Sequence, residues 1–127
     1  MRVIYGIGID FVEVSRVEKI LERWGERFTF RMYSPFEIAY CKKQVFPTMH
    51  YAARFAAKES FLKAAGIGLW MEIRLKDIEV LNNREGGPEI KLHAKARDIL
   101  RDNGISAVHL SLSHTATLAV AMVILEQ

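Results

Sequence analysis

Two acidic residues and one lysine have the types and spacing that metal-assisted phosphate chemistry needs. Asp10 stands where an apolar run ends, so its carboxylate would be fixed at the end of a strand. Glu59 and Lys63 are four residues apart in an alanine-rich segment, and on a helix they would project from one face. The apolar neighbours of Glu59 place it near the core, where an unpaired carboxylate is costly. Mg²⁺ is held by one or two protein carboxylates, which Asp10 and Glu59 would supply.

Simpler explanations fit the same residues. Asp10 alone is typical of a turn or helix cap, and Glu59 with Lys63 fits a surface ion pair. Residues 66–68, Gly-Ile-Gly, would let a phosphate approach the backbone near Lys63, but they also fit a loop that ends a helix. His114 fits either a hydrogen-bonded turn or a contact to an oxyanion. The residues assigned to structural roles are His50, His93, His109 and Cys41.

Helices and strands that position these residues are indicated by periodicity. Ser15 with Glu18 has the form of a capping box, and Ser34-Pro35 with Glu37 marks a second helix start. Helices are predicted over about 16–24, 35–43 and 51–65, with a further one ending at Asn103-Gly104. Strands are predicted over 2–9, 78–81, 89–92, 108–113 and 118–125, with a turn over 84–88. Residues 1–127 are therefore expected to form a single α+β domain, mainly antiparallel sheet packed against helices.

Composition narrows the class of protein. The chain has 127 residues, 50% hydrophobic and 26% charged, which suits one domain with a core and excludes intrinsic disorder. One cysteine excludes internal disulfides, and zinc-ligand spacing is missing. Neither a membrane-spanning apolar stretch nor a signal peptide is recognised, so a cytoplasmic location is expected. Residues 1–63 carry 11 basic and 7 acidic groups, which suits an acidic protein, a phosphate-rich small molecule or nucleic acid as partner.

Three segments in order resemble the holo-[acyl-carrier-protein] synthases, the small type within the 4′-phosphopantetheinyl transferase superfamily. They are residues 6–13 (GIGIDFVE), 54–64 (RFAAKESFLKA) and 109–115 (HLSLSHT), and the similarity spans residues 3–125. The resemblance implies that a serine of apo-acyl-carrier protein attacks the β-phosphorus of coenzyme A. The phosphopantetheine arm is transferred and 3′,5′-ADP is released.

The resemblance also implies roles for individual residues. Asp10 and Glu59 would hold Mg²⁺, with Mn²⁺ as an alternative, and Lys63 would contact the pyrophosphate. Either Glu59 or a metal-bound water would accept the serine proton. The positions that match nucleotide-binding residues are Arg54, Gly66, Pro88, His114 and Thr115.

Partners follow from the same resemblance. Arg16 and Arg23 match carrier-protein contacts on the first helix, and an acidic carrier protein suits the basic half of the chain. The family's small members are homotrimers with sites at subunit interfaces, which implies that each Asp10 faces a neighbour's helix. The apolar run 118–125 would lie at that interface. The positions that depart from the family pattern are Ile67, Gly87 and Leu118, none of them a proposed metal ligand.

Two other functions fit part of the sequence. A small nucleic-acid-binding module would suit the basic first helix, but aromatic residues are not interleaved with the basic ones as a stacking platform requires. A non-catalytic adaptor for an acidic carrier protein would not require Asp10, Glu59 and Lys63 together.

Overall fold

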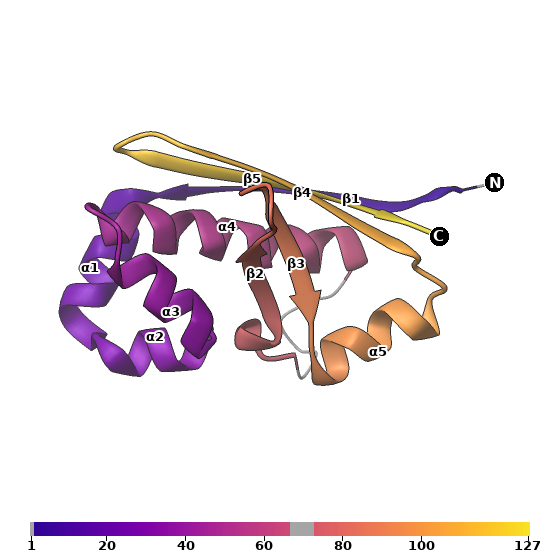
Figure 1. Cartoon of the computed structure of the whole chain (residues 1–127), viewed down its shortest axis with the longest axis horizontal. Coiled ribbons are helices and arrows are strands. Elements are labelled where there is room, and N and C mark those ends of the chain that lie inside the picture. Colours follow the sequence, from indigo (N-terminus) through magenta and orange to yellow (C-terminus); the bar gives the residue numbers. More distant parts are fainter. Residues whose placement is uncertain (1, 67–72) are drawn as a thin grey trace.

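A three-stranded antiparallel sheet and one long helix form the centre of the fold (Figure 1). The structure is a computed structural model and describes residues 2–66 and 73–127. The helices are α1 (Val14–Trp24), α2 (Glu26–Met32), α3 (Pro35–Lys42), α4 (Pro47–Ala65), the 3₁₀ turn η1 (Leu75–Asp77) and α5 (Ala94–Asp102). The strands are β1 (Ile4–Glu13), β2 (Ile78–Asn82), β3 (Pro88–Leu92), β4 (Ala107–His114) and β5 (Leu118–Glu126).

The sheet has the order β1-β5-β4, and α4 packs across one of its faces. The hairpin of β2 and β3 forms a second antiparallel sheet, and β3 contacts β4. In Figure 1, α1 to α3 gather below one end of the large sheet and α5 lies below the other end. The expected α+β architecture is confirmed, as is the antiparallel pairing of the last two strands.

Two glycines allow α4 to lie directly on β1. A Cβ added to Gly6 would come within 1.8 Å of the carbonyl oxygen of Ala64, and one added to Gly8 within 1.9 Å of that of Ser60. Alternate residues of a strand face the same side, so Asp10 follows Gly6 and Gly8 onto the helix-covered face. The close packing therefore sets the distance between Asp10 and the side chains of α4.

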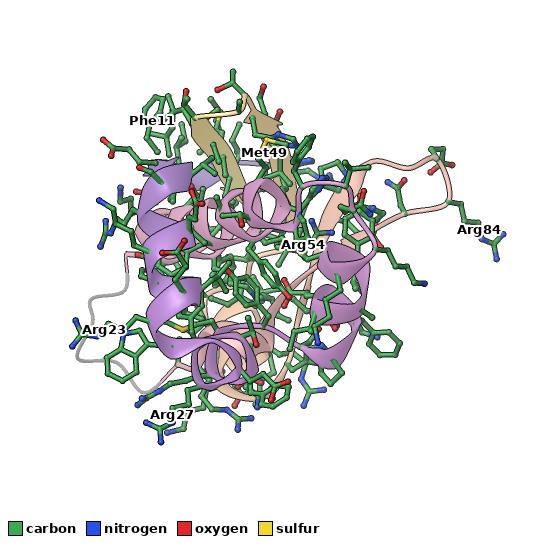
Figure 2. The ribbon with its side chains drawn as sticks, turned by 90° about the vertical axis from the view of Figure 1, so that its left-hand side faces the viewer. Phe11, Arg23, Arg27, Met49, Arg54 and Arg84 are labelled. Carbon is green, nitrogen blue, oxygen red and sulfur yellow. The ribbon has the colours of Figure 1, made fainter. Side chains whose placement is uncertain are left out.

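The opposite face of β1 is apolar and open in the single chain. Ile7 is 58% exposed and Phe11 is 61% exposed, although the sequence pattern predicts a strand buried on both faces. Figure 2 shows Phe11 at the outer edge of the molecule, above the helices. On β5, Met122 lies opposite Ile9 and is also exposed, so the apolar surface continues onto the neighbouring strand.

Two helix starts and one additional helix differ from the sequence prediction. The Ser15 capping box is wrong because β1 runs directly into α1, and the N–H of Val14 donates instead to the Thr117 carbonyl at 3.0 Å. Helix α2 was not predicted, since Gly25 with φ of 50° separates it from α1 by a single residue. Pro47 begins α4 rather than interrupting the chain, because proline is accepted at the first helical position.

The capping box at Ser34 is confirmed. The Glu37 N–H donates to the Ser34 hydroxyl oxygen at 3.2 Å, and the Ser34 N–H donates to the Glu37 carboxylate at 3.0 Å. Among the described residues, no helix is both long enough and apolar enough to span a membrane.

Candidate active site

Asp10 and Lys63 form an ion pair at the edge of the large sheet. The Lys63 Nζ donates to the Asp10 Oδ1 at 2.9 Å and to the Ile9 carbonyl at 3.0 Å. The lysine comes from the last turn of α4, which the close contact at the two glycines holds against β1. Strand, helix and ion pair all belong to one chain, and the expectation that Asp10 also faces a neighbour's helix in a homotrimer stays a prediction.

Glu59 lies one helical turn before Lys63 and completes an acidic pair with Asp10. Burial raises the pKa of the Glu59 carboxyl, and the negative charge of Asp10 raises it further. The positive charges of Lys63 and Arg16 oppose this rise in pKa. The two carboxylates therefore influence each other electrostatically, as groups that share one site do.

The acidic pair fits a metal that needs few protein ligands. Among residues 2–66 and 73–127, no cluster of three or more His, Cys, Asp or Glu side chains is placed to enclose a metal ion. Mg²⁺ commonly takes only one or two carboxylates and completes its octahedron with waters and substrate phosphates. Oxygen donors from Asp10 and Glu59 match that preference, and the negative charge of Asp10 is one cause of the raised pKa of Glu59, after burial.

A second group of side chains gathers at the other edge of the sheet, around Arg54. The Arg54 guanidinium lies over the Tyr40 ring at 4.2 Å, and the residue is only 3% exposed. The His50 ring packs edge-on against those of Tyr40 and His114, with centroid distances of 5.8 and 5.1 Å. We call Tyr40, His50, Arg54 and His114 the Arg54 group. Figure 2 shows Arg54 in the interior of the molecule.

The acidic pair and the Arg54 group lie on opposite sides of α4. Successive residues of a helix are rotated by about 100°, so Arg54 is about 140° from Glu59 and about 180° from Lys63. Strand β1, which carries Asp10, and strand β4, which carries His114, are the two outer strands of the sheet. One chain therefore does not gather all the residues that the resemblance assigned to the site.

The remaining nucleotide-binding candidates lie on turns. Gly66 ends α4 with φ of 75°, a left-handed conformation that favours glycine. The Thr115 hydroxyl oxygen accepts from the N–H groups of Thr117 and Leu118 at 3.2 and 3.1 Å, so it organises the turn between β4 and β5. Pro88 begins β3, on the side of the molecule where the hairpin contacts β4.

Ile67 and Gly68, the other residues of the predicted Gly-Ile-Gly loop, lie outside the described residues. Gly87 is the residue before Pro88, and its N–H donates to the Asn83 side chain at 2.9 Å. Leu118, the third departure from the family pattern, is the first residue of β5 and is partly exposed.

The carrier-protein candidates Arg16 and Arg23 both lie on α1. The charge of Arg16 acts on Glu59, whereas the guanidinium of Arg23 lies 5.1 Å from the centre of the Trp24 ring. A groove of about 450 Å³ begins beside Trp24, and its lining residues are Trp24, Arg27, Phe28, Arg31 and Met32. Arg23 and Arg27 extend outward from this end of the molecule in Figure 2.

Sequence reasoning did not place Tyr40 and His50 beside Arg54. His50 precedes Arg54 by four residues, so helical spacing alone would have put both on one face of α4. Tyr40 belongs to another helix, and its contact with Arg54 is visible only in the tertiary structure.

Comparison with known proteins decides the family. Residues 6–122 match the family model of the 4′-phosphopantetheinyl transferase superfamily. The chain belongs to this superfamily. A superfamily member from Syntrophus aciditrophicus, a holo-[acyl-carrier-protein] synthase, is 54% identical over 97% of this chain and 96% of its own length.

Solved structures of phosphopantetheinyl transferases agree with the fold. The holo-[acyl-carrier-protein] synthase from Neisseria meningitidis has a TM-score of 0.91 and 33% identity, covering 98% of this chain and 100% of that one. The Helicobacter pylori synthase, solved in complex with coenzyme A, has a TM-score of 0.82 and 33% identity, covering 94% and 98% of the two chains.

Proposed function

We propose that this phosphopantetheinyl transferase converts apo-acyl-carrier protein to its holo form with coenzyme A as donor. The carrier serine oxygen bonds to the β-phosphorus of coenzyme A, the pyrophosphate bond to that phosphorus breaks, and 3′,5′-ADP leaves. The serine proton passes to a base. The observation that carries the proposal is the acidic pair beside Lys63 in a chain of this superfamily.

Asp10 and Glu59 would hold Mg²⁺ or Mn²⁺, and the ion would supply charge neutralisation to the pyrophosphate. Lys63 reaches the acidic pair from α4 and brings a further positive charge to the same phosphates. Glu59, or a water molecule held beside it, accepts the serine proton. A raised pKa suits Glu59 to that role, because a more basic carboxylate takes up a proton more readily.

The Arg54 group would bind the nucleotide end of coenzyme A, together with Gly66, Thr115 and Pro88. Because the Arg54 group and the acidic pair lie on opposite sides of α4, we propose that a complete site combines the two halves from adjacent copies. The exposed apolar face of β1 and β5 supports such an assembly, since a homotrimer with closed symmetry would cover three of these faces.

Arg16 and Arg23 would bind an acidic surface of the carrier protein. Their helix begins directly after β1, only a few residues from Asp10, so a carrier protein bound there would present its serine near the acidic pair. The location of Arg16 within the electrostatic reach of Glu59 supports this arrangement.

The decisive experiment incubates the protein with coenzyme A, Mg²⁺ and an apo-acyl-carrier protein and measures the carrier's mass. A gain of one phosphopantetheine group, lost in Glu59→Gln, is expected. A carrier protein that binds but gains no mass would favour the adaptor function, and binding of nucleic acid without binding of carrier protein would favour the other rival.

A further inference from the structure

Lys63 binds the carboxylate that the proposed metal ion would also bind. Its Nζ donates to the Asp10 Oδ1 at 2.9 Å and to the Ile9 carbonyl at 3.0 Å, so two oxygens at the edge of the sheet hold the ammonium. Mg²⁺ and Mn²⁺ prefer oxygen donors of the same kind. A metal ion bound to Asp10 would stand close to the Lys63 ammonium, and like charges repel each other. The two cations therefore weaken each other's binding to Asp10.

The charge of Lys63 also acts on Glu59, the other member of the acidic pair. Burial raises the pKa of Glu59 and the charge of Asp10 raises it further, whereas the charges of Lys63 and Arg16 lower it. Lys63 in addition makes the direct hydrogen bond to Asp10. It thus compensates part of the negative charge that would attract a metal ion to the acidic pair.

The ion pair of Lys63 with Asp10 is placed so that it can separate. The side chain of Lys63 is 54% exposed and that of Asp10 is 19% exposed, and ion pairs open to water are weak. Lysine carries its charge on a flexible four-carbon stem, so the ammonium can change partners while α4 stays in place. Lys58 on the same helix differs, because it is enclosed and bonded to Glu37 and two carbonyls.

We propose that Lys63 keeps the metal affinity of the acidic pair low until coenzyme A binds and draws the lysine from Asp10 to the pyrophosphate. This inference rests on the proposed function, which brings the metal ion and the pyrophosphate to the same place. The pyrophosphate supplies negative charge for the ammonium, and Asp10 is then released for the metal ion. Lys63 thereby couples the two binding events, and each strengthens the other by the same factor.

Binding of Mn²⁺ to the full chain tests this exchange. Electron paramagnetic resonance detects free Mn²⁺ and so gives the bound fraction, and carrier protein is left out so that no transfer takes place. Lys63→Met removes the competing charge. This variant should bind Mn²⁺ alone more tightly than the wild type by about fivefold or more, the effect of a neighbouring positive charge that water largely screens.

Coenzyme A and two further variants separate the exchange from other effects. Coenzyme A should tighten Mn²⁺ binding in the wild type, and by a smaller factor in Lys63→Met, because no lysine has to leave Asp10 there. Lys63→Arg keeps the positive charge and should bind Mn²⁺ alone nearly as weakly as the wild type. Lys91→Met is the matched control, since it removes an exposed lysine from β3 in the other sheet. It should keep the wild-type affinity for Mn²⁺ alone.

Nuclear magnetic resonance of the lysine Nζ groups gives an independent measurement in the wild type. The scalar coupling across the hydrogen bond from Lys63 to the Asp10 carboxylate should be present in the protein alone and absent with Mg²⁺ and coenzyme A. A coupling that persists, or a folded Lys63→Met that binds Mn²⁺ no more tightly than the wild type, would overturn the exchange while leaving the proposed transferase function intact. A wild type that binds no Mn²⁺, with or without coenzyme A, would overturn both the exchange and the metal assignment.

Discussion

Lys58 and Glu37 form an ion pair that is completely closed off from solvent. The Lys58 Nζ lies 2.8 Å from the Glu37 Oε1, and both side chains have an exposed fraction of 0%. The lysine also donates to the carbonyls of Leu75 and Ile78 at 2.9 and 2.6 Å, and the Val80 N–H donates to the carboxylate of Glu37 at 3.2 Å. The pair thus joins α3 and α4 to the hairpin.

This pair helps to fix the rotation of α4 about its own axis. Burial raises the pKa of Glu37 and lowers that of Lys58, and the attraction between the two charges opposes both shifts. Lys58 and Glu59 are neighbours in the chain, so their side chains point about 100° apart. With Lys58 held in the core, Glu59 is directed toward Asp10.

Removing one partner of this pair should destabilise the protein strongly. Lys58→Met leaves the Glu37 carboxylate buried without its cation, so the free energy of unfolding should fall by about 3–5 kcal/mol. Urea unfolding followed by circular dichroism measures this loss. The double variant Lys58→Met with Glu37→Gln should recover part of it, because no charge then stays buried alone. A loss below about 1 kcal/mol in the single variant would contradict the structural role of the pair.

The acidic pair should be needed for transfer but not for folding. Asp10→Asn and Glu59→Gln each remove a proposed metal ligand, so the rate of phosphopantetheine transfer should fall by at least about 100-fold, equivalent to about 3 kcal/mol of transition-state stabilisation. EDTA should inactivate the wild type, and added Mg²⁺ should restore it. Mass spectrometry of the carrier protein measures the rate.

Asp102→Asn is the matched control for these variants, since Asp102 is exposed at the end of α5. Its rate should equal that of the wild type. A wild type that stays fully active in EDTA would refute the metal assignment.

The spacing of residues that are close together in the chain explains which features the sequence could predict. Helical spacing along α4 put Glu59 and Lys63 on one face, and the Ser34 capping box depends on residues three apart, so both could be inferred without tertiary structure. Gly25 gave no comparable signal, because a glycine with positive φ marks the end of α1 without indicating that α2 begins at the next residue.

Contacts between residues far apart in the chain explain which features the sequence could not predict. Asp10 and Lys63 are 53 residues apart, and their pairing depends on how closely α4 lies on Gly6 and Gly8. The burial of Lys58 and the contacts of Arg54 with Tyr40 likewise arise between helices that have no periodic relation to each other. The residue types on α4 were visible in the sequence, but not which of them points inward.

Docking of the carrier protein should depend on charge, with different consequences at the two arginines. Arg23→Glu should raise the KM for the carrier protein and leave the KM for coenzyme A unchanged. Arg16→Glu should also lower kcat, because Arg16 acts electrostatically on Glu59. Steady-state kinetics with each substrate varied in turn separates these effects. Added salt should imitate Arg23→Glu, since exposed charges are screened.

Arg97→Glu is the matched control, because it changes the net charge by the same amount as Arg23→Glu but lies on α5, away from α1. The KM values for carrier protein and for coenzyme A should both stay near those of the wild type. Equal weakening of carrier protein and coenzyme A by Arg23→Glu would contradict a dedicated docking role.

Complementation between inactive variants should reveal how the halves of the site are shared. Asp10 and Glu59 occupy one chain, so a mixture of Asp10→Asn and Glu59→Gln subunits, dissociated and reassembled, should stay inactive. A mixture of Glu59→Gln and His114→Ala should regain activity at about one quarter of the sites, because a hybrid trimer then pairs an intact acidic pair with an intact Arg54 group from its neighbour.

Light scattering of each variant checks the assembly on which this experiment depends. Phe11→Asp places a charge on the exposed apolar face of β1 and should dissociate the trimer and abolish transfer together. A monomeric wild type would refute the assembly. Recovery of activity in the Asp10→Asn and Glu59→Gln mixture would instead show that these two carboxylates act from different chains. That result would contradict an acidic pair formed by Asp10 and Glu59 of one chain.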